Sequence, residues 1–174
     1  MSWGHFYCGK DCVAVLPTGY GKSLIFYLLP ALLRGKLDNE GPSSPQAVVV
    51  IVSPLNALIK DQLRRINERS IRAAALKVKR KQNTGDLEFD FENANPSLLK
   101  YAKYDMLFLR PEAFLTCMDG KELLQSAPYQ RSVKAIVVDE AHCILEWKDN
   151  LIHIIMLSGA VSYNTRMNMG KMIW

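Results

Sequence analysis

One short segment, residues 15–23, constrains the possible folds of this chain more than any other. It reads Val-Leu-Pro-Thr-Gly-Tyr-Gly-Lys-Ser, and it lies between an apolar run at residues 11–16 and an apolar stretch at residues 23–29. The first run predicts a short buried strand, and the second predicts the start of a helix. We expect that helix to end near Leu33, because residues 34–45 are rich in glycine, proline and serine and predict a loop. A strand, a glycine-bearing turn, Gly-Lys-Ser and a helix together form the sequence context of a phosphate-binding loop.

The residue types in this segment suit a nucleotide phosphate. Gly19 and Gly21 permit backbone angles that a side chain would forbid, so the amides of the loop can converge on phosphate oxygens. Lys22 would reach the β- and γ-phosphates, and the hydroxyl of Ser23 would ligate Mg²⁺. Leu16 stands where the general pattern has its first glycine. The alternative is a glycine-rich turn followed by a surface lysine.

Further apolar runs predict a mainly parallel sheet. Such runs occur at residues 47–52, 105–109 and 132–138, with a weaker candidate at 71–78. The β-branched run at 47–52 is typical of a strand buried on both faces of a parallel sheet. Apolar residues spaced at helical intervals between Leu55 and Ile66 predict a helix, and residues 79–101 predict a loop with one helical turn or more. Strands that alternate with helices indicate an α/β fold.

Two acidic residues, Asp139 and Glu140, come directly after the last apolar run. Ligands of parallel α/β sheets bind at the carboxyl ends of the strands, so we expect both residues to lie near the phosphate loop. Asp139 would hold Mg²⁺ through water, and Glu140 would orient or deprotonate an attacking water. The alternative is that they cap the start of a helix.

Positive charge is concentrated in one part of the chain. The formal net charge is +5, and residues 60–81 hold nine basic residues and only two acidic ones. Such a local excess is typical of a surface that binds a polyanion such as nucleic acid. The alternative is a solvated helix face followed by a basic loop.

Composition favours an intracellular protein in a reducing compartment. No apolar run reaches the roughly 18 residues that a membrane span needs, and the first residues do not resemble a secretory signal. The four cysteines, Cys8, Cys12, Cys117 and Cys143, lack paired C-x-x-C spacing and therefore predict free thiols. A metal shared by Cys8 and Cys12 remains an alternative.

Four motifs, in this order along the chain, resemble the RecQ family of DEAH-type, ATP-dependent DNA helicases. They are residues 17–23, the segment from Ser53-Pro54-Leu55 to Asp61-Gln62, Arg110-Pro111-Glu112, and residues 139–144 with Trp147. The resemblance covers about residues 9 to 149. It implies a P-loop NTPase (RecA-like) three-layer sandwich, and a family activity that couples ATP hydrolysis to 3′-to-5′ movement on DNA.

The resemblance implies a role for each matching residue. The ATP phosphates would be bound by Pro17, Thr18, Gly19, Tyr20, Gly21, Lys22 and Ser23. Ser23 and Asp139 would hold Mg²⁺. The catalytic residues would be Lys22, Asp139, Glu140 and His142, with His142 coupling the nucleotide to the nucleic-acid site. Single-stranded or junction DNA would be contacted by Ser53, Pro54, Lys60, Gln62, Arg64, Arg110 and Trp147, whose ring suits base stacking. Such a partner implies the nucleus or the cytoplasm.

The sequence also departs from the family pattern. The first ten residues do not supply the Phe-Arg-x-x-Gln element that reads adenine, which predicts poor adenine preference. A second RecA-like domain with its arginine finger is expected in cis but is absent from these 174 residues. We therefore expect a partial lead-in at 1–10, the ATP-binding domain at 11–150 and a divergent tail at 151–174.

The family pattern and these departures together predict the ATP-binding domain of a RecQ-like helicase that is weak or inactive on its own. One alternative is a fragment that binds nucleotide or nucleic acid without catalysis. Another is a small phosphate-loop kinase, although the sequence shows neither an acceptor site nor a lid.

Overall fold

The computed structural model describes residues 20–38, 46–80, 87–92, 94–111, 113 and 118–139. Its helices are α2 (Lys22–Asp38), α3 (Asn56–Asn67), α4 (Pro96–Lys100), α6 (Met118–Gln125) and α7 (Ala127–Ser132). Its strands are β1 (Val48–Val52), β2 (Ala73–Arg80), β3 (Leu87–Glu92), β4 (Met106–Leu109) and β5 (Val133–Val138). The predicted strand at 11–16, the lead-in at 1–10 and the tail at 151–174 lie outside the described residues.

The strands form one sheet in the order β3-β2-β4-β1-β5. Neighbours from β2 to β5 run parallel, and β3 is antiparallel to β2, which confirms the predicted mainly parallel sheet. In the register, Val52 of β1 pairs with Leu109 of β4 and with Val138 of β5. Ser53 then donates its amide to the Leu109 carbonyl at 3.0 Å, and Asp139 donates to the Val52 carbonyl at 2.9 Å. Three neighbouring strands therefore end together at one edge of the sheet.

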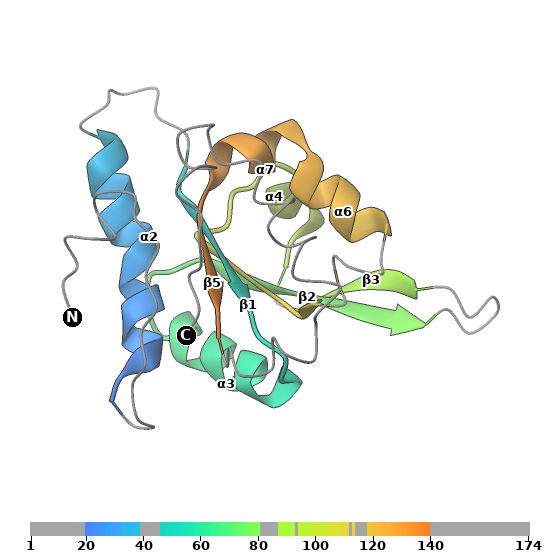
Figure 1. Ribbon diagram of the computed structural model, residues 1–174, viewed down its shortest axis with the longest axis horizontal. Helices are drawn as coiled ribbons and strands as arrows, with labels where there is room; N and C mark the ends of the chain where they lie inside the picture. Colours follow the sequence, from blue (N-terminus) through green and yellow to red (C-terminus); the bar gives the residue numbers. More distant parts are fainter. Residues whose placement is uncertain are drawn as a thin grey trace.

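Helices cover both faces of the sheet, so the domain has the expected three layers (Figure 1). All five residues of β1 are buried: Val49 and Ile51 pack toward α2 and α3, whereas Val48, Val50 and Val52 pack toward α4, α6 and α7. The buried helical partners on the first face include Phe26, Tyr27, Leu29, Ile59, Leu63 and Ile66. A strand that is apolar on both faces fits this position, because both of its faces meet a helix layer.

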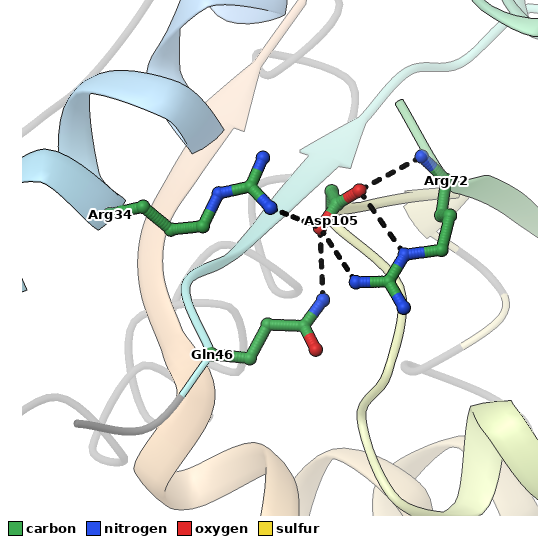
Figure 2. A network of polar contacts seen from close by, with 4 residues as sticks. All are labelled: Arg34, Gln46, Arg72 and Asp105. Atoms are coloured by element: carbon green, nitrogen blue, oxygen red, sulfur yellow. Dashed lines mark hydrogen bonds and ion pairs between the residues drawn. The ribbon is translucent and has the colours of Figure 1, made fainter. Parts of the chain in front are cut away.

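A buried carboxylate joins the elements at the opposite, amino-terminal edge of the sheet (Figure 2). Asp105 precedes β4 and accepts hydrogen bonds from Gln46 before β1 at 2.9 Å and from the amide of Arg72 before β2 at 2.9 Å. The guanidinium groups of Arg72 and of Arg34 on α2 reach the same carboxylate at 3.3 and 3.4 Å. One side chain thus holds three strand starts and the last turns of α2 in position.

One expected helix end is wrong, and two elements were not expected. Helix α2 continues through Gly35 to Asp38, beyond the end expected near Leu33, and its late residue Arg34 is held by Asp105. The segment at 79–101 contains the expected helical turn as α4, whose cap Asn95 accepts an amide hydrogen bond from Ser97 at 2.9 Å, but it also contains the unexpected strand β3. Helix α7 was not expected.

The buried face of α3 is also narrower than predicted. Leu55 precedes the first turn of the helix and is 52% exposed, whereas Ile59, Leu63 and Ile66 are buried. Within the residues that the structure describes, no helix has the length and hydropathy required to cross a membrane.

Candidate nucleotide site

The first turn of α2 follows a left-handed glycine. Gly21 has a φ of +77°, a conformation that L side chains rarely adopt, and Lys22 is the first helical residue. The carbonyl of Gly21 accepts the amide of Leu24 at 2.9 Å, which closes the first turn. Amides at a helix start lack partners within the helix and carry partial positive charge. This end of α2 is therefore suited to bind a phosphate.

The carboxyl edge of the sheet lies at the same end of the domain. Arg110, Ser53 and Asp139 come directly after β4, β1 and β5. In Figure 1 the dark-blue start of α2 lies at the lower end of the view, toward which β5 also runs. The sheet therefore brings Asp139, the predicted acidic residue, to the end of the domain where α2 begins.

Ser23 is joined to the interior by a chain of hydrogen bonds. Its Oγ accepts from Nε2 of Gln62 on α3 at 2.9 Å, and Oε1 of Gln62 accepts from the hydroxyl of Tyr27 on α2. Tyr27 and Gln62 are buried. The second residue of α2 is thus tied both to α3 and to the next turn of its own helix.

The surroundings of Tyr27 connect this chain of hydrogen bonds to Asp139. Burial raises the pKa of the Tyr27 hydroxyl; the positive charges of Arg65 and Arg69 lower it, and the negative charges of Asp61 and Asp139 raise it. The guanidinium of Arg69 also lies 5.4 Å from the centre of the Tyr27 ring. Phe26 and Tyr27 also share a buried cluster with Val137 of β5, so the first turns of α2 lie close to the end of the strand that Asp139 follows.

The side chains at this edge fit a hard divalent cation such as Mg²⁺. Ser23 provides a hydroxyl oxygen and Asp139 a carboxylate, the donor types that Mg²⁺ prefers. A hydroxyl oxygen that accepts one N–H keeps a second lone pair for a metal. The described ranges contain no group of three or more His, Cys, Asp or Glu side chains that could hold a metal ion. Mg²⁺ commonly completes its shell with phosphate oxygens and water.

The predicted nucleic-acid residues that the structure describes differ in their exposure to solvent. Lys60 and Arg64 are exposed on α3, where Arg64 pairs with Asp61 at 2.9 Å. By contrast, the buried residues Ser53 and Gln62 are only 3% and 8% exposed. Two further predicted contacts, Pro54 and Arg110, are half-buried.

The two buried residues, Ser53 and Gln62, differ in their hydrogen bonds. The side chain of Gln62 faces Ser23 and Tyr27. The Oγ of Ser53 has no hydrogen-bond partner among the described residues. Contact of these two side chains with DNA stays a prediction.

Several predicted residues cannot be placed. The described part of the phosphate loop begins at Tyr20, which is 73% exposed. The remaining predicted residues, Pro17, Thr18, Gly19, Glu140, His142 and Trp147, lie outside the described residues. Their roles stay predictions.

Sequence reasoning missed the inward position of Gln62. The signal was available, because Gln62 shares the buried face of α3 with Ile59, Leu63 and Ile66 at helical spacing. A polar residue among buried positions needs a hydrogen-bond partner. Helical spacing alone could not identify Ser23 as that partner.

A left-handed glycine, a helix that begins with Lys-Ser and an aspartate directly after a parallel strand define the class of P-loop nucleotide-binding domains. The family model of the DEAD/DEAH box helicases matches residues 1–168, so the chain belongs to the DEAD/DEAH box helicase family.

Similar proteins narrow this assignment. The chain is 36% identical over 139 residues to a probable ATP-dependent DNA helicase RecS of Bacillus subtilis, covering 80% of the chain and 23% of the relative. It is 35% identical over 146 residues to the ATP-dependent DNA helicase RecQ of Synechocystis sp., covering 81% and 25%. To the bifunctional 3′-5′ exonuclease/ATP-dependent helicase WRN of Mus musculus it is 32% identical over 139 residues, covering 79% and 8%.

These matches confirm the resemblance to RecQ-like helicases, with the chain corresponding to their ATP-binding domain. The chain spans about a quarter or less of the length of these relatives.

Proposed function

We propose that this chain binds ATP and Mg²⁺ at the carboxyl edge of its sheet. Within a helicase, it would couple ATP hydrolysis to 3′-to-5′ movement on DNA. The observation that carries the proposal is the start of α2: Lys22 and Ser23 follow the left-handed Gly21 on a helix that packs against β5, the strand directly before Asp139. A positively polarised helix end, a cationic side chain and two oxygen ligands are what a magnesium–nucleotide complex requires.

Each side chain of the site has a distinct proposed task. The ammonium group of Lys22 contacts the β- and γ-phosphates, and Ser23 and Asp139 supply metal ligands. When bound, Mg²⁺ neutralises phosphate charge. Glu140 orients the attacking water, and His142 connects the nucleotide to the nucleic-acid site.

The exposed basic residues of α3 support DNA as the partner. Lys60 and Arg64 project from the solvent face of the helix whose buried face contacts Ser23 through Gln62. Phosphate contacts from such residues position a nucleic acid without reading its sequence. Single-stranded or junction DNA is the proposed substrate, with Trp147 stacking on a base. DNA as a substrate favours the nucleus or the cytoplasm.

Nucleotide titration tests the core of the proposal. We expect Lys22→Ala to weaken Mg²⁺–ATP binding about ten- to a hundredfold, because it removes a charge-assisted contact to phosphate. Lys103→Ala is the matched control, since Lys103 is an exposed lysine just before β4, at the opposite edge of the sheet. Equal binding by the Lys22 variant and the control would overturn the site. Binding without turnover would favour the non-catalytic alternative.

A further inference from the structure

We propose that Gln62 is a positioning residue, which fixes the hydroxyl of Ser23 as a ligand for nucleotide-bound Mg²⁺. This inference rests on the proposed function, because it assumes that Ser23 meets a metal at this site. The role goes beyond the DNA contact that the family resemblance assigns to Gln62. The hydrogen bonds of Gln62 support this role.

The two hydrogen bonds of Gln62 fix the orientation of its amide. A tyrosine hydroxyl can donate to the carbonyl oxygen of an amide, so Oε1 faces Tyr27 and the NH₂ group faces Ser23. Ser23 is therefore held as an acceptor by Nε2 at 2.9 Å. One lone pair of Oγ remains for a metal, and the hydroxyl hydrogen can turn away from it.

Packing keeps this arrangement in place. Gln62 is 8% exposed among the apolar residues of α3, and a buried amide is costly unless it is hydrogen-bonded. Tyr27 is fixed in turn by an edge contact with Phe26, whose ring centre lies 5.1 Å away, and by the guanidinium of Arg69. Rotation of the amide would cost both hydrogen bonds, so Ser23 is held by a well-ordered partner.

Such a partner matters because a free serine hydroxyl rotates. Groups that hydrogen-bond to a metal ligand orient it, and their loss commonly weakens metal binding about 10- to 100-fold. Gln62 would have that effect on Ser23. It would have little effect on phosphate binding by Lys22 and the helix start, which does not depend on the Ser23 hydroxyl.

Gln62→Met separates the effect on Mg²⁺ binding from the effect on phosphate binding, because methionine has similar length but cannot donate a hydrogen bond. The substitution leaves the Tyr27 hydroxyl without its acceptor, so the double variant Tyr27→Phe/Gln62→Met, which removes both polar groups, preserves packing. Gln46→Met is the matched control: Gln46 also uses its amide to bind a side chain, Asp105, but at the other edge of the sheet.

The measurement is binding of a fluorescent ATP analogue to the 174-residue chain, titrated with Mg²⁺ and repeated in EDTA. We expect both Gln62 variants to raise the Mg²⁺ concentration at half-maximal effect about 10- to 100-fold, with unchanged affinity in EDTA. Gln46→Met should leave the midpoint unchanged. An unchanged midpoint in a folded Gln62 variant would overturn the role of Gln62 but leave the proposed magnesium site standing. Wild-type binding that does not respond to Mg²⁺ would overturn the magnesium site and the inference together.

Discussion

The amide of Arg72 donates to Oδ2 of Asp105 at 2.9 Å, and the amide of Asp105 donates to the carbonyl of Arg72 at 2.8 Å. The two residues precede neighbouring parallel strands, so this reciprocal pair fixes the start of β2 against the start of β4. Gln46 adds the start of β1 to the same carboxylate. The edge of the sheet opposite the nucleotide site is therefore held by one buried charge (Figure 2).

Loss of this carboxylate should destabilise the domain. Asp105→Ala leaves the amides of Arg72 and Gln46 without their acceptor, and we expect the free energy of unfolding to fall by about 3 kcal/mol. The arginine side chains of Arg34 and Arg72 are 41% and 51% exposed, so water can solvate them again. Urea denaturation measures the change. Asp119→Ala, at an exposed position of α6, is the control and should cost less than about 1 kcal/mol. Equal losses in the two variants would contradict the role of Asp105.

Alanine substitution should destabilise the domain at Gly21 and stabilise it at Gly35. Gly21→Ala places a side chain at a φ of +77°, which costs about 1–2 kcal/mol although no atom lies within 4 Å of the new Cβ. Gly35→Ala lies inside α2, again with nothing within 4 Å, and should stabilise the chain by about 1 kcal/mol. Thermal unfolding of both variants tests this. Stabilisation by Gly21→Ala would show that the left-handed turn is not formed.

Alkaline pH should destabilise the domain through two buried tyrosines. Burial raises the pKa of Tyr27, and it raises the pKa of Tyr129 strongly, with Tyr104 adding to the shift. The folded state then keeps its protons longer than the unfolded state. Each tyrosine therefore lowers the free energy of unfolding by about 1.4 kcal/mol per pH unit, from about pH 10 up to its folded-state pKa.

Phenylalanine substitutions separate the two tyrosines at neutral pH. The hydroxyl of Tyr129 has no hydrogen-bond partner among the described residues, so Tyr129→Phe should be neutral or stabilising. Tyr27→Phe removes the donor to Gln62 and should cost about 1 kcal/mol. Both substitutions should flatten the alkaline slope of urea-derived stability. A slope that neither substitution changes would place the alkaline sensitivity elsewhere.

The basic face of α3 should dominate the salt dependence of DNA binding. Reversal of Lys60 and Arg64 to glutamate should weaken single-strand binding. It should also reduce the slope of log affinity against log salt by about 0.7 for each DNA phosphate that the variant no longer neutralises. The matched control reverses Lys100 and Arg131, exposed residues of α4 and α7 in the other helix layer. If both double variants bind alike, α3 is a solvated face and not the DNA surface.

Much of the fold could be predicted because its central strands are continuous apolar runs. Strands β1 and β4 are such runs, and burial on both faces leaves few alternatives to a central parallel strand. Strand β5 is also mostly apolar, although Lys134 interrupts it. Strand β3, Leu87–Glu92, is an outermost strand of the described sheet, and its sequence alternates apolar and acidic residues. Its sequence resembles a polar loop until its antiparallel partner β2 is known. The end of α2 was missed because a glycine suggested a break, whereas a distant carboxylate holds the last turns.

The site shows the same division between local and long-range information. The left-handed turn and the helix that starts at Lys22 follow from a local pattern, and Asp139 follows from its place after a strand. The bond between Gln62 and Ser23 joins residues 39 positions apart. Only the packing of α3 against α2 brings them together, and no local pattern contains that packing.

The central claim is that nucleotide-bound metal lies between the start of α2 and the end of β5. Nuclear magnetic resonance of the labelled chain with Mn²⁺–ATP tests it directly, with Mg²⁺–ATP as the diamagnetic reference. We predict selective broadening of the amide signals of Gly21, Lys22, Ser23 and Asp139, while those of α6 on the other face stay sharp. Broadening centred away from α2 and Asp139, or no selective broadening when nucleotide is bound, would contradict the account.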